Sequence, residues 1–314
     1  MLQALQGVNP MIWLIGGGGL FLIGAALMAT GLFTARKGKQ RLCAAPLKQA
    51  RQDKPIVRAF CASLIGDRPY QQDYALIPCS IPEETLQRKG CLCVLCDGMG
   101  GMRGGERASS RCAEGLFQAY YGGEYPSPAD FYQTEIPRMD EAVAGLKGEN
   151  EAPLGGGTTL VSVLIQNGLA WFASVGDSRV YLYRGNTLHL LTRDHNYQLL
   201  LDEQAKNGQI TREEALTHPQ REALISYIGM DGLRLMDIRK DGFAVTPGDL
   251  FLLCSDGLTK AMSEEELRLL IEAGMTEPSL LPNQLAQAAF SKKWIAHDNI
   301  TAVILAVTAA SSKV

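Results

Sequence analysis

Four aspartates at the ends of strongly apolar segments are the residues of this 314-residue chain best suited to chemistry: Asp97, Asp177, Asp256 and Asp298. A single aspartate beside a glycine is commonly a turn residue. Four brought together by a fold would repel one another unless divalent cations lay between them, and carboxylate oxygens suit Mg²⁺ or Mn²⁺. The pattern therefore indicates a two-metal site that activates water and holds a phosphoryl group.

Two glycine-rich segments lie close to these aspartates in the sequence. Five glycines between residues 98 and 105 follow Asp97 and would let the backbone approach a metal ion or a phosphate closely. The segment 155–159 (GGGTT) lacks the lysine of a nucleotide-binding loop, so it predicts no nucleotide site.

The segments that must position the aspartates are mostly short apolar strands bounded by Gly or Asp. Two hairpins are indicated, one turning at Asn167 and Gly168 and the other at residues 184–186. Ser263 and Glu266 predict a capping box. Helical patterns cover residues 106–121, 128–146, 197–207, 211–216, 263–273 and 283–290. Because hairpins dominate, we expect an α+β fold: an antiparallel two-sheet β-sandwich flanked by helices in α-β-β-α layers.

Seven motifs occur in an order that resembles the metal-dependent protein phosphatases, the type 2C family, over roughly residues 60–307. The motifs are RPYQQD (68–73), LCDGMGG (95–101, followed by GGERAS), GGGTT (155–159), VGDSRVY (175–181), LTRDH (191–195), LLCSDGLT (252–259) and DNITAV (298–303), and residues 207–221 resemble the bacterial flap. The resemblance implies hydrolysis of phosphoserine and phosphothreonine in proteins by a water or hydroxide that bridges two Mn²⁺ or Mg²⁺ ions, without a phosphoenzyme.

The resemblance also implies catalytic and metal-binding roles. Asp97 would bind both metals, with the carbonyl of Gly98 on one of them, and Asp256 and Asp298 would bind the second. Arg68 would bind the substrate phosphate, because a guanidinium fork matches its oxygens.

Further residues would support this centre. Gln72, where relatives more often have Glu, would hold a metal-bound water, and Asp177 matches an aspartate that helps to bind a third, weaker metal. The residues expected around the metal ligands are Asp73, Gly157, Thr158, Thr159 and Asn299.

Two departures from the family pattern affect these expectations. Met99 stands where animal members have a histidine, so the proton for the leaving oxygen is expected from a metal-bound water, with His195 as the side-chain alternative and a structural role favoured for it. Lys260, four residues after Asp256, stands where relatives have an aspartate. We expect its ammonium to lie near Asp177 in place of the third metal, which puts that metal in doubt; the alternative is a solvent-facing lysine.

Residues 1–35 carry no charged side chain, and residues 11–33 are apolar over a length that can cross a bilayer. Basic residues follow directly, and such residues favour the cytoplasmic side. The sequence predicts a single-pass anchor in the cell membrane within residues 1–35, with the N-terminus outside. A basic juxtamembrane linker (36–58), a cytoplasmic phosphatase domain (59–308) and a tail (309–314) would follow.

Charge and cysteine content exclude other classes of protein. Residues 36–58 have a net charge of +7, which leaves −10 on the rest of a chain whose total is −3. An acidic body argues against a nucleic-acid partner. The eight cysteines are expected to be free thiols. Zinc binding by Cys91, Cys93 and Cys96 is the alternative, but their spacing is that of a strand with the first two on one face.

Two other functions remain open from the sequence. One is a pseudo-phosphatase that binds phosphoproteins without hydrolysis, and the other is a two-metal hydrolase of small phosphoesters. The presence of Arg68, Asp97, Asp256 and Asp298 favours catalysis on phosphorylated proteins, a serine/threonine kinase and its targets among them.

Overall fold

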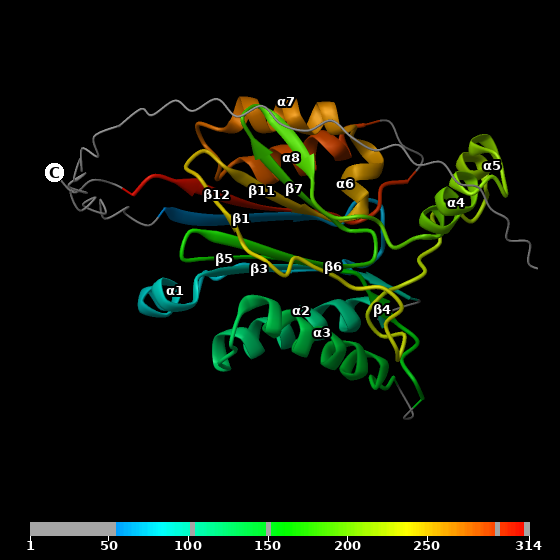
Figure 1. The fold of residues 1–314 in the computed structure, drawn as a ribbon, viewed down its shortest axis with the longest axis horizontal. Helices are drawn as coiled ribbons and strands as arrows, with labels where there is room; N and C mark the ends of the chain where they lie inside the picture. The colour runs from blue at the N-terminus through cyan, green and yellow to red at the C-terminus, as the bar shows by residue number, and fades with distance from the viewer. Residues whose placement is uncertain (1–54, 101–103, 149–151, 293–295, 311–314) are drawn as a thin grey trace, which may run out of the picture. The chain divides into compact units, whose positions relative to one another are not determined.

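The computed structural model describes residues 55–100, 104–148, 152–292 and 296–310. Within this part of the chain, two antiparallel sheets pack face to face and helices cover the outer face of each (Figure 1). The predicted α-β-β-α layers are therefore confirmed.

The first sheet has five strands in the order β1 (Ile56–Leu64), β12 (Ile300–Thr308), β11 (Leu250–Cys254), β7 (Arg179–Arg184) and β8 (Thr187–Leu190). Neighbouring strands are antiparallel throughout. Its outer face is covered by α6 (Asp256–Ala261), α7 (Glu264–Gly274) and α8 (Leu281–Phe290).

The second sheet has the order β10 (Phe243–Ala244), β6 (Leu169–Val175), β5 (Leu160–Gln166), β3 (Cys91–Met99) and β2 (Asp73–Leu76), with β4 (Gly157–Thr158) beside β3 and β9 (Asp237–Ile238) beside β6. The helices α2 (Gly104–Gly122) and α3 (Pro128–Ala144) cover its outer face (Figure 1). The remaining helices are α1 (Glu83–Lys89), α4 (Tyr197–Lys206) and α5 (Arg212–Thr217).

Side chains of β3 alternate between two apolar layers, as period-two strand geometry requires. Cys91 and Cys93 lie in the layer between the sheets, whereas Cys96 packs in the layer beneath α2 and α3. The predicted faces of these cysteines are therefore confirmed. All seven cysteines among the described residues are free thiols.

Local sequence signals explain most element boundaries. The β5–β6 hairpin turns at Asn167 and Gly168, whose φ angles of 53° and 76° fit an Asn-Gly turn. The capping box at Ser263 and Glu266 begins α7. The six predicted helices are present, whereas α1 and α6 were not predicted; both are short, and unlike the equally short α5 neither opens with a capping box.

Two predictions concern the N-terminal part of the chain. The phosphatase domain was predicted to start at residue 59, but β1 begins three residues earlier, at Ile56. This strand pairs along its whole length with β12. The predicted membrane helix within residues 1–35 lies outside the described residues. In the described ranges, no helix combines the length and apolar character needed to span a bilayer.

Candidate active site

Five aspartates come together at one end of the sandwich, and four of them are those that the sequence singles out. Asp97 ends β3 and is paired across the sheet with Asp73 of β2. Asp256 opens α6 directly after β11, Asp298 lies two residues before β12, and Asp177 links β6 to β7. All four of the other carboxylates act electrostatically on Asp97.

Burial and mutual repulsion make three of these carboxylates, those of Asp73, Asp97 and Asp177, hard to ionise. Burial, followed by repulsion from Asp73 and Asp256, raises the pKa of Asp97 well above its usual range. Burial also raises the pKa of Asp73 to about 7 and that of Asp177 to about 7, and hydrogen bonding to Ser255 only partly offsets the first shift. A cation in their midst would relieve the repulsion.

The GGGTT segment holds the backbone of Asp97. The Thr159 N–H and the Thr158 hydroxyl both donate to the Asp97 carbonyl, at 2.8 and 2.9 Å, and the Asp97 N–H donates to Thr159 Oγ1 at 3.0 Å. A Cβ on Gly157 would lie 2.5 Å from the ring of Tyr227, so this position requires glycine. These three predicted supporting residues therefore lie directly against Asp97 or its neighbours.

The loop before β2 is fastened to the start of β12 by Asn299. Its side-chain oxygen accepts the Gln72 N–H at 2.7 Å, and its amide nitrogen donates to the carbonyls of Ile65 and Tyr70. Within this loop Arg68 donates to Asp298 Oδ2 at 2.8 Å, yet its side chain is 57% exposed. The loop therefore presents a guanidinium at the rim of the carboxylate cluster.

The backbone around Gly98 is too close-packed for any other residue. A Cβ there would lie 2.2 Å from the carbonyl oxygen of Gly105. The Gly98 N–H donates to the Gln72 carbonyl, and Gln72 Nε2 donates to the Gly100 carbonyl at 3.2 Å. The glycine-rich segment after β3 thus packs against the loop that carries Arg68.

Ser255 is a site residue that sequence analysis missed, although it lies inside the LLCSDGLT motif. Its hydroxyl donates to Asp73 Oδ2 at 2.7 Å and accepts the Thr301 N–H at 3.0 Å. It therefore ties the buried Asp73 to β12 beside Asp256.

Lys260 lies near enough to Asp177 to interact with it electrostatically, as expected, but its direct partner is a different aspartate. Its ammonium forms an ion pair with Asp256 one helical turn away, where we expected Asp177 as its partner. Burial opposes its charge, but attraction to Asp256, Asp177 and Asp298 outweighs this and raises the pKa of Lys260. The reason is α-helical spacing, which brings residues i and i+4 together on α6. The lysine faces the cluster and is not directed wholly to solvent.

His195 has a structural position. Its side chain is fully buried, Nδ1 accepts the Gly176 N–H at 3.2 Å, and Nε2 lies 3.2 Å from Asp237 Oδ2. Burial lowers the pKa of His195 despite the nearby carboxylate. Gly176 has a φ of 102° and immediately precedes Asp177, so the histidine fixes the turn that carries this aspartate.

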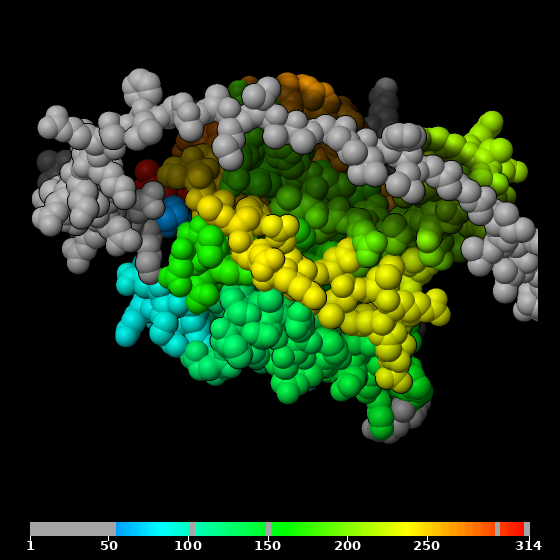
Figure 2. Space-filling view, viewed as in Figure 1, coloured from blue at the N-terminus to red at the C-terminus, as the bar shows by residue number. Residues whose placement is uncertain are grey.

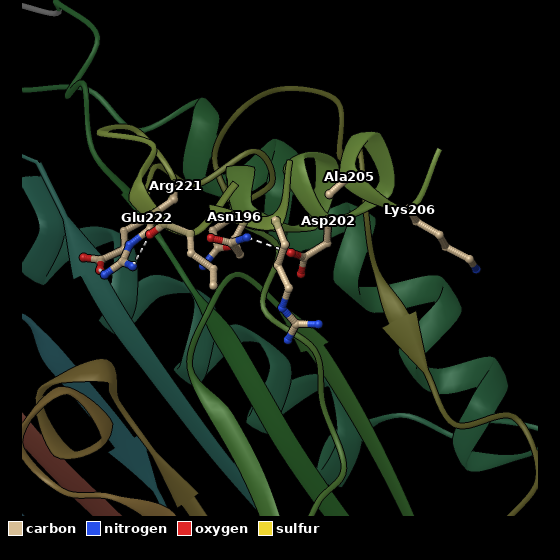
Figure 3. A pocket seen from close by; sticks show the side chains of 9 residues that line it. Asn196, Asp202, Ala205, Lys206, Arg221 and Glu222 are labelled. Carbon is tan, nitrogen blue, oxygen red and sulfur yellow. Dashed lines mark hydrogen bonds and ion pairs between the residues drawn. The ribbon is translucent and has the colours of Figure 1, made fainter. Parts of the chain in front are cut away.

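Two cavities are relevant to the site, and one of them adjoins the carboxylate cluster at Asp298. A small one of about 160 Å³ is lined by Arg68, Lys260, His297 and Asp298 among others. A larger one of about 660 Å³ lies between α4 and α5, the region that the sequence assigned to a flap (Figure 3). Its lining includes Asn196, which follows His195 in the sequence.

The donor set suits hard divalent cations. Asp73 Oδ1 and Asp256 Oδ1 are buried without a hydrogen-bond partner, and the other available donors are carboxylate and carbonyl oxygens. In the part of the chain that the structure describes, no three His, Cys, Asp or Glu side chains converge into a ready-made metal cage. Mg²⁺ in phosphoryl-transfer sites commonly uses one or two carboxylates together with water and substrate oxygens, so the residues present fit such a site.

Comparison with known proteins agrees with this geometry. The protein phosphatase 2C family model matches residues 123–203. The serine/threonine phosphatase of Listeria welshimeri is 35% identical over 185 residues, covering 57% of this chain and 71% of that protein. Protein phosphatase PhpP of Streptococcus pneumoniae is 36% identical over 184 residues, covering 56% and 70%. The solved structure of the S. agalactiae serine/threonine phosphatase has a TM-score of 0.66 at 27% identity, covering 80% of this chain and 100% of that one. This chain therefore belongs to the protein phosphatase 2C family and is a serine/threonine phosphatase.

Proposed function

We propose that the enzyme hydrolyses phosphoserine and phosphothreonine in proteins, using two Mn²⁺ or Mg²⁺ ions held at the strand-end aspartates. The observation that carries the proposal is the gathering of four other buried or half-buried carboxylates around Asp97, with raised pKa values at Asp73, Asp97 and Asp177 and unpaired oxygens on Asp73 and Asp256. A structural acid in a protein interior is normally paired, so buried carboxylate oxygens left without a partner indicate a cation site.

The resemblance to the family suggests which residues would hold the ions: Asp97, the Gly98 carbonyl, Asp256 and Asp298, with Gln72 and Asp177 nearby. When bound, the metal pair would lower the pKa of a shared water and neutralise charge on the phosphoryl group. The hydrogen bonds from Thr158 and Thr159 would fix the backbone position from which the Asp97 carboxylate projects.

Arg68 would orient the substrate. Its exposed guanidinium has donors left over after its bond to Asp298, and these can bind phosphate oxygens in a bidentate manner. The carboxylate of Asp298 would hold the guanidinium at the rim, so the phosphate would be drawn toward the cluster in a fixed orientation.

The leaving oxygen must receive a proton from water in this proposal. Met99 has no proton to donate, and the buried ring of His195 is held by Gly176 and Asp237. A side chain in that position supports the geometry of Asp177 and not proton transfer to a substrate.

A phosphopeptide assay tests the proposal. The chain should release phosphate from phosphoserine and phosphothreonine peptides in Mn²⁺ or Mg²⁺ and stop in chelator. Full activity in chelator would refute the metal requirement. Binding of phosphopeptides without any hydrolysis in either metal would favour the pseudo-phosphatase, and a strong preference for small phosphoesters would favour the other hydrolase. Phosphoproteomics of a deletion strain against a D97N strain would then identify the substrates, a kinase and its targets being the expected class.

We propose in addition that residues 11–33 anchor the enzyme in the cell membrane with the phosphatase domain in the cytoplasm. The support is the length of this apolar segment and the basic residues that follow it. A reporter fused after Val314 should behave as cytoplasmic, and removal of residues 1–35 should release a soluble, active enzyme. An extracytoplasmic signal from the reporter would reverse the topology.

A further inference from the structure

Asp140 on α3 is a buried acid outside the carboxylate cluster, and it holds a backbone turn. Its Oδ1 accepts the N–H groups of Gly229 and Met230 at 2.6 and 3.1 Å, and its Oδ2 accepts that of Gly232 at 2.7 Å. It is 3% exposed and, among the described residues, forms no ion pair. Three convergent backbone N–H groups form an anion-binding nest, and here the protein's own carboxylate fills it.

The turn that Asp140 holds contains three residues with positive φ angles. Gly229 and Gly232 have φ angles of 101° and 132°, which glycine adopts readily, and Asp231 has a φ of 55°, which is uncommon for a non-glycine residue. Figure 2 shows the segment around residues 225–245, in yellow, on the surface beside the green helices that include α3. The glycines permit this turn, and the three hydrogen bonds to Asp140 tie it to α3.

The same segment continues directly into the active site. Ile228, next to Gly229, exchanges two backbone hydrogen bonds with Thr158, at 3.0 and 2.8 Å. Thr158 and Thr159 in turn bind the carbonyl of Asp97. A continuous set of hydrogen bonds therefore runs from the carboxylate of Asp140 to the backbone of Asp97.

We infer that Asp140 is a positioning residue for Asp97: it fixes the turn at 229–232, the turn fixes the GGGTT segment, and that segment fixes the orientation of the Asp97 carboxylate. The inference rests on the proposed metal-dependent function, since the property it controls is the fit of Asp97 to a metal ion. Residues that orient metal ligands commonly change metal affinity 10- to 100-fold when replaced.

The substitution Asp140→Asn tests this role with little change in shape. The asparagine keeps one acceptor oxygen, but its NH₂ group must face at least one of the three backbone N–H groups, so the nest opens. We expect Mn²⁺ affinity, measured as free Mn²⁺ by electron paramagnetic resonance, to fall about 10-fold. We also expect faster hydrogen exchange in residues 155–160, and a lower kcat with little change in KM for the phosphopeptide.

Glu135→Gln is the matched control on the same helix. Glu135 is 4% exposed and accepts hydrogen bonds from Tyr125 and Arg138, away from the turn. Its replacement should lower the melting temperature while leaving Mn²⁺ affinity and exchange at residues 155–160 unchanged. Equal losses of Mn²⁺ affinity in both variants would mean general destabilisation and would overturn the inference.

Two further readouts keep the inference testable if Asp140→Asn fails to fold or the metal proposal fails. In the wild-type enzyme, Mn²⁺ should slow exchange of the amides at 229–232, because coupling between two sites is reciprocal. If the wild type binds no Mn²⁺, the proposed function fails, but faster exchange at 155–160 in Asp140→Asn would still support the hydrogen-bond connection. Two results would overturn the inference while leaving the proposed function intact. In one, the wild type binds Mn²⁺ but the amides at 229–232 gain no protection from exchange. In the other, Asp140→Asn has the same Mn²⁺ affinity and the same exchange rates as the wild type.

Discussion

The two ends of β11 carry aspartates in opposite circumstances. Asp249, just before the strand, is buried and takes two hydrogen bonds from Arg184, at 2.7 and 2.6 Å, and one from the Thr246 N–H at 2.7 Å. Asp256, just after the strand, shares one oxygen with Lys260 and leaves the other buried and unpaired among further acids.

This difference separates a carboxylate that supports the fold from one available for chemistry. A buried charge that is fully paired contributes a fixed geometry, and removing one partner is costly. A buried charge set against like charges makes the fold less stable and is retained where function requires it. The comparison predicts that substitutions at the two ends will separate activity from stability.

The largest effect is expected from Asp97→Asn. Loss of the carboxylate that is expected to bind both metals should lower kcat for a phosphothreonine peptide by at least about 100-fold. The same change removes repulsion, so the metal-free protein should melt at the same temperature as the wild type or higher. Near-normal activity of this variant would contradict the two-metal proposal, and a large fall in melting temperature would contradict the repulsion.

Asp249→Asn should have the opposite effect. Loss of the charge-assisted bonds to Arg184, which is partly exposed, should cost about 2 kcal/mol of unfolding free energy. For a domain of this size that is a fall of about 4–8 °C in melting temperature. Activity per folded molecule should stay within about twofold of the wild type. If Asp249→Asn changed kcat or the metal dependence as much as Asp97→Asn does, the two ends of β11 would not differ in role.

The raised pKa values predict a pH dependence of stability in chelator. Burial is the main cause that raises the pKa of Asp177 to about 7, whereas the pKa of an unfolded aspartate is about 4. Between these values the native state holds the extra proton, so this contribution to stability declines as pH rises from about 4 to 7.

The variant Asp177→Asn isolates this group from others that titrate in the same window, such as His195, whose pKa is lowered. The melting temperature of the variant minus that of the wild type should grow as pH rises from 5 to 8. Saturating Mn²⁺ should reduce the trend, because a cation replaces the proton. A difference that stays flat or shrinks in chelator would contradict the assigned repulsion.

The layers of the fold could be predicted because hairpin turns, helix caps and strand periodicity are local signals. Asn167-Gly168 and the Ser263 capping box each specify their element within a few residues. The short helix α6 was not predicted because its start at Asp256 fits a turn after a strand equally well and, unlike the six-residue α5, it has no capping box.

The members of the site could be predicted from their strand-end positions, but their partners could not. The i,i+4 spacing that brings Lys260 to Asp256 exists only if residues 256–261 form a helix, and because α6 was not predicted, Asp177 was expected as the partner of the lysine. Nor does any local signal relate Asp140 to a turn 89 to 92 residues away, because that contact depends on how α3 packs.

Lys260 offers the smallest and most specific test of the comparison. Its ammonium is attracted by the carboxylates of Asp177, Asp256 and Asp298. It therefore neutralises part of the negative charge of the cluster, as Arg184 neutralises that of Asp249. A positive charge there should weaken any further cation, and activity should saturate at low metal concentration with no second, millimolar phase. Lys260→Asp should introduce such a phase, because it adds a carboxylate and removes the competing charge.

Lys260→Met is the control, because it removes the charge without adding a ligand. It should tighten Mn²⁺ binding by a few-fold, since the ammonium no longer pairs with Asp256, and it should create no millimolar phase. A wild-type enzyme that already shows weak metal activation, unchanged in Lys260→Asp, would mean that the lysine does not stand in for an ion. The unpaired oxygen of Asp256 would then remain the feature that separates this end of β11 from the other.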